Sequence, residues 1–164
     1  QTLARAFVQT GWRAVRFNFR GVGASAGAYD EGRGEAADML EVIRQVAPEG
    51  PLAVAGFSFG AFVTSHVVAQ SSAPLTPRLP EKIVLVGTAA SRFAVAPIAP
   101  ELHERTLVLH GEQDDTVVLS SVMDWARPQS LPVTVIPGVE HFFHGQLPLL
   151  KSLVVRHLLA PVQA

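Results

Sequence analysis

The sequence predicts an α/β protein with a doubly wound, mostly parallel β-sheet covered by helices on both faces. Three observations lead to this prediction. Short apolar runs of strand length alternate with longer segments whose apolar residues recur at helical spacing. Glycine and proline residues fall between these segments, where turns are needed. Most residues of the strand-length runs are apolar, as is typical of strands that helices bury on both faces.

Residues 1–55 are expected to hold two helices and two strands. The first helix ends at Gly11, because its apolar residues recur at helical spacing only up to that glycine. The apolar run Ala14–Phe19 is expected to be a strand, and the glycines of Arg20–Ser25 indicate a turn. A second amphipathic helix is ended by Pro48, and Leu52–Ala55 reads as a buried strand.

The rest of the chain continues the same alternation. Helices are expected where apolar residues share one helical face, and strands where a short apolar run stands between turn signals. The expected helices are Ala61–Ala69, Ser120–Arg127 and Leu149–Leu158, and the expected strands are Lys82–Val86, Thr106–His110 and Val133–Ile136.

Composition limits the classes of protein that the chain can belong to. Of its 164 residues, 48% are hydrophobic, and no repeat or linker divides them, so we expect a single domain over residues 1–164. A net charge of −1 gives no reason to expect nucleic acid or a membrane as partner, so the expected partner is a small molecule. The absence of cysteine excludes disulfides and thiolate catalysis. No apolar run reaches the roughly 18 residues of a membrane span. We expect a cytoplasmic location. The oligomeric state stays open.

The pattern Gly56-Phe57-Ser58-Phe59-Gly60 is the strongest functional signal in the chain. A serine hydroxyl is a weak nucleophile, and a sharp turn from strand to helix exposes it to a base and to a substrate carbonyl. We expect small residues at Gly56 and Gly60 because a Cβ atom there would collide with the adjoining strand or helix. Ser58 is the predicted nucleophile, and the backbone N–H of Phe59 is the predicted oxyanion donor.

The acid and the base are expected in loops that follow later strands. Asp114 follows one predicted strand and His141 follows the next, so the order serine, aspartate, histidine is satisfied. Asp114 is predicted to orient His141, which takes the proton from Ser58 and returns it to the leaving group.

Neighbouring residues compete for both roles. Glu112 and Asp115 are also carboxylates, and His144 lies three residues after His141. We expect Asp115 to be a solvated loop charge or to hydrogen-bond its own turn, and His144 to lie near the base without taking part in the proton transfer. His110 is expected to pack beside the acid loop. No histidine or carboxylate has a spacing typical of a metal site, so neither metal nor cofactor is expected.

Four segments together resemble the α/β-hydrolase superfamily, and most closely its small lid-less bacterial group related to dienelactone hydrolases. They are residues 17–25, 56–60, 110–117 and 138–145. The resemblance implies the α/β-hydrolase fold. It also selects Asp114, the third residue after the glycine of a His-Gly pair, and His141, the residue before a Phe-Phe pair.

The superfamily has further strands, and a loop with a second oxyanion donor, before the element that matches the first helix of this chain. The resemblance therefore implies that the chain is part of a longer hydrolase that lacks its N-terminal strands. It also implies that Ala14–Phe19 has no neighbouring strand, whereas the four later strands remain contiguous. An arginine-glycine turn such as Arg20–Ser25 is expected to pass near the rim of the site for structural reasons.

The expected function is hydrolysis of a carboxylic ester through an acyl-enzyme. Residues 87–105 are too few for a lid domain, so an accessible site is expected. The phenylalanines at positions 57, 59, 142 and 143 either line that site or pack in the core. A thioesterase or a serine peptidase would use the same triad, and a non-catalytic binding module would keep the same fold.

Overall fold

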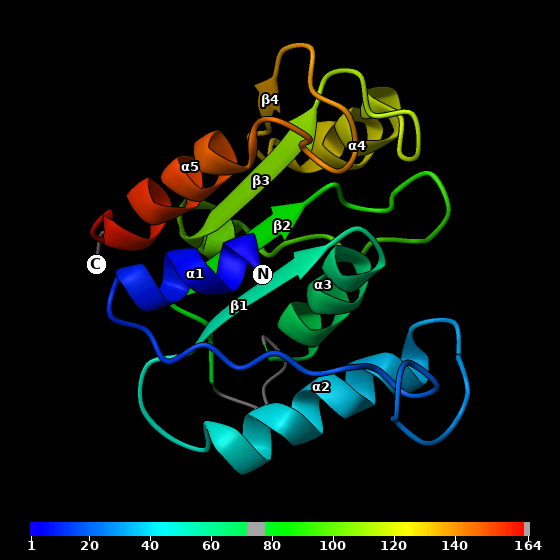
Figure 1. Cartoon of the computed structure of the whole chain (residues 1–164), viewed down its shortest axis with the longest axis vertical. Coiled ribbons are helices and arrows are strands. Elements are labelled where there is room, and N and C mark those ends of the chain that lie inside the picture. The colour runs from blue at the N-terminus through cyan, green and yellow to red at the C-terminus, as the bar shows by residue number, and fades with distance from the viewer. Residues whose placement is uncertain (72–77, 163–164) are drawn as a thin grey trace.

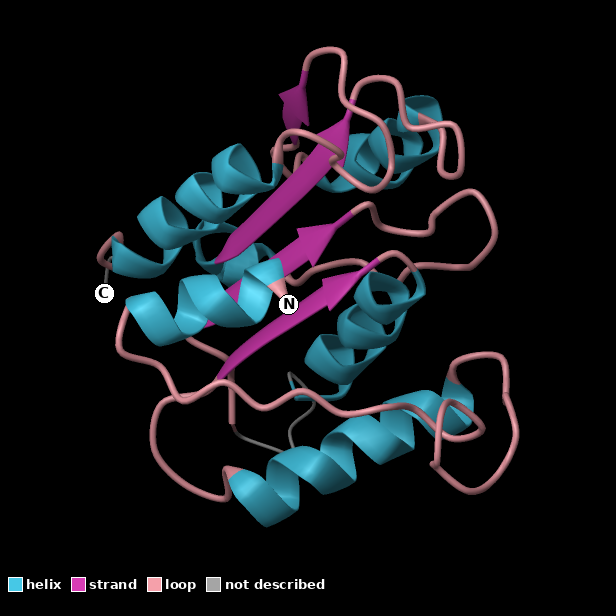
Figure 2. Cartoon of the chain, in the orientation of Figure 1, coloured by secondary structure: helices cyan, strands magenta, loops and turns pink. Residues whose placement is uncertain are grey.

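The computed structural model of the chain describes residues 1–71 and 78–162. Its centre is a parallel sheet of four strands in the order β1-β2-β3-β4, so neighbours in the chain are also neighbours in the sheet (Figures 1 and 2). The strands are β1 (Ala53–Phe57), β2 (Lys82–Val86), β3 (Thr106–Gly111) and β4 (Thr134–Ile136). The predicted α/β class with a doubly wound parallel sheet is confirmed.

Helices cover both faces of this sheet (Figure 1). Helices α1 and α5 pack against each other on one face, and α2, α3 and α4 cover the other. The helices are α1 (Thr2–Gln9), α2 (Arg33–Val46), α3 (Phe59–Ser71), α4 (Leu119–Ala126) and α5 (Leu147–Leu159), with short 3-10 helices η1 (Pro100–Arg105) and η2 (Arg127–Gln129). Within residues 1–71 and 78–162, no helix is both long enough and apolar enough to cross a membrane.

Strand β2 shows why the chain forms two cores. Successive side chains of a strand point to opposite faces of the sheet. Ile83 and Leu85 join the core beneath α2 and α3, whereas Val84 and Val86 join the core beneath α1 and α5. All four side chains are fully buried, so an apolar residue is needed at every position.

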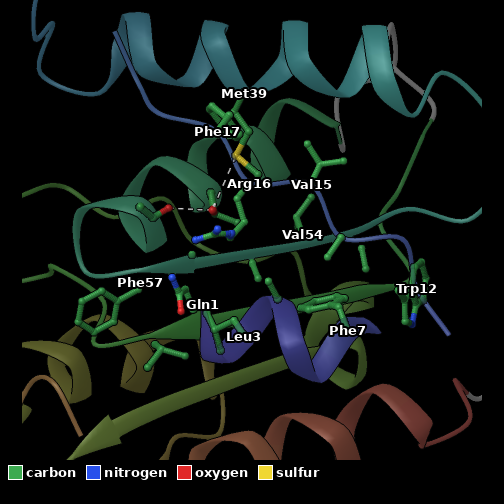
Figure 3. A pocket seen from close by; sticks show the side chains of 18 of the residues that line it. Gln1, Leu3, Phe7, Trp12, Val15, Arg16, Phe17, Met39, Val54 and Phe57 are labelled. Atoms are coloured by element: carbon green, nitrogen blue, oxygen red, sulfur yellow. Dashed lines mark hydrogen bonds between the residues drawn. The ribbon is translucent and has the colours of Figure 1, made fainter. Parts of the chain in front are cut away.

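The prediction of a strand at Ala14–Phe19 is wrong, because residues 12–19 belong to no helix or strand. A strand needs a hydrogen-bonded neighbour, and β1 at the edge of the sheet pairs only with β2. A cavity of about 860 Å³ lies between residues 12–19 and β1 (Figure 3). Leu3 of α1 and Met39 of α2 line it from opposite sides of Val54 in β1.

Candidate active site

The carboxyl ends of the parallel strands meet at one edge of the sheet (Figure 1). Ser58 directly follows β1, Asp114 follows β3, and His141 follows β4. Loops at this edge of a parallel sheet commonly carry the functional groups of α/β proteins. The fold thus brings together three residues that lie up to 83 positions apart in the sequence.

Ser58 occupies a strained turn between β1 and α3. Its φ angle is 55°, a left-handed conformation that is rare for a residue with a side chain. Its backbone N–H donates to the carbonyl of Val86 at 2.8 Å, which fixes the turn to β2. A Cβ atom on Gly56 would overlap the backbone of Gly60, so Gly56 is required here. The same expectation for Gly60 is wrong, because a Cβ atom there has no neighbour within 4 Å.

His141 stands between Ser58 and Asp114. Its Nε2 atom lies 3.1 Å from Oγ of Ser58, and its Nδ1 atom lies 2.6 Å from Oδ2 of Asp114. His141 is 2% exposed and Asp114 is 4% exposed. A carboxylate accepts the proton of Nδ1, so the neutral ring presents the lone pair of Nε2 to the serine hydroxyl. This arrangement can move a proton from Ser58 to the imidazole.

Backbone groups hold the carboxylate of Asp114 in place. Its Oδ1 atom accepts hydrogen bonds from the N–H groups of Thr116 at 3.0 Å and Val117 at 2.7 Å. Asp115 is exposed and has no hydrogen bond or ion pair in the described part of the chain. Glu112 instead connects two loops. Its Oε2 atom accepts a hydrogen bond from the N–H of Gly138 at 2.8 Å, which links the acid loop to the histidine loop.

His110 packs beneath the acid loop, as the sequence predicts. It is fully buried, its Nε2 atom lies 2.7 Å from the carbonyl oxygen of Val117, and the same atom lies 3.5 Å from Oδ2 of Asp114. Burial lowers the pKa of His110, which keeps the ring neutral. A neutral ring with a proton on Nε2 donates to Val117, and no described residue pairs with its Nδ1 atom.

Glu140 shapes the loop that carries His141. Its carboxylate accepts the backbone N–H groups of Phe142 at 2.9 Å and His144 at 2.7 Å, and these bonds lower the pKa of Glu140. The ring of His144 is exposed and lies 3.2 Å from the same carboxylate. His144 therefore belongs to the loop around the base but contacts neither Ser58 nor Asp114.

Two glycines, whose lack of a side chain was not predicted to matter, make room for this geometry. Gly87, at the end of β2, has a φ angle of 56°, and a Cβ atom on it would lie 3.1 Å from Cε1 of His141. A Cβ atom on Gly111 would overlap the carbonyl of Val139, where the acid loop crosses the histidine loop. Both glycines directly follow a predicted buried strand, and this position in the sequence could have indicated their role.

The four phenylalanines near the turns divide between site and core. The rings of Phe57 and Phe142 lie 4.8 and 5.0 Å from that of His141, and both are partly exposed. Phe143 is only 1% exposed and packs in the core beneath α5. Phe59 lines a pocket of about 420 Å³ that also contains Ser58. The larger cavity beside β1 contains none of the three residues of the hydrogen-bonded relay.

Phe59 is the first residue of α3, so its N–H has no partner within that helix. No acceptor for this group is found among residues 1–71 and 78–162. It stands next to Ser58, at the positive end of the helix dipole. In the same parts of the chain, no three histidine, aspartate or glutamate side chains converge as a metal site requires.

Comparisons with known proteins agree with this architecture. The family model of X-Pro dipeptidyl-peptidase (S15 family) matches residues 1–84. The protein RP471 of Rickettsia prowazekii is 27% identical, over 85% of this chain and 61% of its own length. The chain therefore spans about three fifths of that curated relative.

Two solved structures are more similar in sequence. An α/β serine hydrolase without a lid from Xanthomonas campestris is 32% identical, with a TM-score of 0.80 over 99% of this chain and 74% of that one. An α/β serine hydrolase homologue from Coxiella burnetii is 33% identical, with a TM-score of 0.75 over 97% of this chain and 74% of that one.

Proposed function

Since the chain belongs to the α/β serine hydrolases without a lid, we propose that it hydrolyses a carboxylic ester through an acyl-enzyme on Ser58. His141 is the general base and acid, Asp114 orients it, and the N–H of Phe59 stabilises the oxyanion. The substrate is a small molecule, and the reaction needs no cofactor, because the side chains supply both the nucleophile and the proton transfer.

The observation that carries this proposal is the continuous relay from Ser58 through His141 to Asp114, with contacts of 3.1 and 2.6 Å. A nucleophile within hydrogen-bond reach of a base, with the base oriented by a third group, is the signature of covalent catalysis. The positive φ angle of Ser58 supports it further, because backbone strain of this kind persists where the surrounding structure imposes it.

The reaction follows from these positions. Oγ of Ser58 attacks the ester carbonyl as His141 takes its proton, and the carbonyl oxygen becomes an anion beside the N–H of Phe59. The tetrahedral intermediate collapses, the bond to the alcohol breaks, and His141 gives its proton to the departing alkoxide. Water then attacks the acyl-enzyme with His141 again as base, which releases the acid and restores Ser58.

A serine peptidase is the second candidate, because the matched S15 model describes a dipeptidyl-peptidase and its matched residues 1–84 include Ser58. The triad serves either reaction, and the leaving group and the pocket decide between them. A thioesterase would also use the triad. A non-catalytic module would keep the same three residues but would turn over no substrate.

A substrate panel tests the proposal. Short and long p-nitrophenyl esters, acyl thioesters and aminoacyl-proline anilides are compared on the wild type and on Ser58→Ala. We expect ester turnover that Ser58→Ala abolishes. Turnover confined to anilides or thioesters would favour the other hydrolases, and turnover of no substrate, or equal turnover by the Ser58→Ala variant, would refute the proposed catalysis.

A further inference from the structure

The pocket beside Ser58 is walled by aromatic rings. The ring of Phe59 packs against three others. Its centroid lies 5.8 Å from that of Phe19, 5.7 Å from that of Tyr29 and 5.3 Å from that of Phe93. These four residues and Ser58 all line the same volume of about 420 Å³. Rings in edge and tilted contact form an apolar wall that favours a hydrocarbon or aromatic group.

Three charged side chains also line this pocket, and two of them already have partners within the chain. The guanidinium of Arg20 is held by both carboxylate oxygens of Asp38, at 2.7 and 3.0 Å. The buried carboxylate of Glu35 accepts two backbone N–H groups of the preceding turn, at 2.8 and 2.9 Å. The charge of Arg20 is thus paired with that of Asp38, and the carboxylate of Glu35 is already hydrogen-bonded within the chain.

Arg92 differs from both. It lies in the loop after β2 and is exposed, and its guanidinium has no hydrogen bond or ion pair with any residue in the described ranges. An arginine presents several donors in a planar fork that matches a carboxylate. The pocket thus combines an apolar wall with one cation whose hydrogen-bonding capacity is free.

The position of His141 decides which part of a substrate enters. The leaving group must lie beside Nε2 of His141 in order to receive a proton. His141 does not line this pocket, whereas Ser58 and Phe59 do. The pocket therefore takes the acyl part of the substrate, which stays bonded to Ser58.

We propose that the preferred substrate has an apolar acyl group that ends in an anionic group, and that Arg92 is the residue that selects it. This inference rests on the proposed function and names its substrate class. The apolar part of the acyl group packs against the rings, and its terminal carboxylate pairs with the guanidinium of Arg92.

Two esters of equal chain length test the proposal: p-nitrophenyl hexanoate, with a methyl end, and the mono-p-nitrophenyl ester of adipic acid, with a carboxylate end. We expect the wild type to show about tenfold higher kcat/KM for the adipate ester at low salt. Arg92→Gln lowers kcat/KM for the adipate ester to the level of the hexanoate ester, and Arg92→Lys keeps part of the preference. Added salt reduces the preference.

Arg156→Gln is the matched control, because Arg156 is an exposed arginine on α5 that does not line the pocket. A wild type without adipate preference, or a preference that survives Arg92→Gln or is lost in Arg156→Gln, would overturn the proposal while the esterase function stands. Should neither ester be hydrolysed, the proposed function fails instead. Calorimetric binding of the adipate ester to Ser58→Ala then tests Arg92 alone, and binding that Arg92→Gln does not weaken overturns its role.

Discussion

The Nδ1 atom of His141 lies 2.6 Å from Oδ2 of Asp114, and both side chains are almost wholly buried. Asp115, the next residue in the chain, is exposed. Two adjacent carboxylates therefore have different surroundings, although the sequence presents them side by side. The geometry selects Asp114 as the partner of the histidine.

Asp114→Asn is expected to lower kcat by about 10⁴-fold, because an amide no longer fixes the proton on Nδ1 of His141 and does not stabilise the imidazolium. Asp115→Asn, the adjacent control, should change kcat little. Steady-state ester hydrolysis by both variants measures the difference. Equal losses, or a larger loss in Asp115→Asn, would mean that Asp114 is not the orienting acid.

Gly56→Ala and Gly60→Ala form a second matched pair. The Cβ atom of Gly56→Ala overlaps the backbone at Gly60, and overpacking of this kind costs about 1–3 kcal/mol or more. Gly60 lies in α3 with open space around it, so Gly60→Ala should raise the free energy of unfolding by about 0.5–1 kcal/mol. Urea titrations of both variants measure these free energies of unfolding. A Gly56→Ala variant more stable than the Gly60→Ala variant would contradict this account.

Gly87→Ala separates backbone strain from crowding of the base. Gly87 and Gly50 both have positive φ angles, of 56° and 80°, so alanine at either position costs about 1–2 kcal/mol of folding stability. Only the alanine at Gly87 presses on His141. We expect similar losses of stability in Gly87→Ala and Gly50→Ala, with a fall in kcat for Gly87→Ala alone. An unchanged kcat in a folded Gly87→Ala protein would show that the ring has room to move.

The sequence predicted most of the fold, because its signals were local. The run Lys82–Val86 is apolar apart from its first residue, and a strand buried on both faces needs such a run. The pattern around Ser58 and the chain order of Asp114 and His141 were likewise visible. The structure brings these three residues together.

The errors concern properties that depend on distant parts of the chain. Ala14–Phe19 has a strand-like composition, but a strand needs a hydrogen-bonded neighbour, and the family resemblance had already implied that this segment has none. A Cβ atom on Gly60 was expected to collide with its surroundings and does not, whereas one on Gly87 would meet the ring of His141. The free guanidinium of Arg92 could not be predicted, since a missing partner is a property of the folded surroundings.

His157 should make the stability of the fold dependent on pH. Burial, and to a smaller degree the ammonium of Lys82, lower the pKa of His157 from 6.5 to about 4. Between these values the unfolded chain binds more protons than the folded one, so the free energy of unfolding falls as the pH falls from about 6.5 towards 4. His157→Gln should reduce this loss of stability by about 1–2 kcal/mol, because solvent reaches part of the ring and weakens the effect of burial.

Urea titrations at pH 7 and pH 4.5 measure this effect, with His144→Gln as the control, because the ring of His144 is exposed. An identical pH dependence in the wild type and in His157→Gln would show that His157 is not the group responsible.

The central claim is that Ser58 is a nucleophile activated by His141, and labelling with a fluorophosphonate tests it most directly. The reagent forms a covalent bond with an activated serine, and peptide mass spectrometry locates the adduct. We predict one adduct, on Ser58, that is absent from Ser58→Ala and strongly reduced in a folded His141→Ala variant. Equal labelling of the wild type and Ser58→Ala, or no labelling of the folded wild type, would contradict the account.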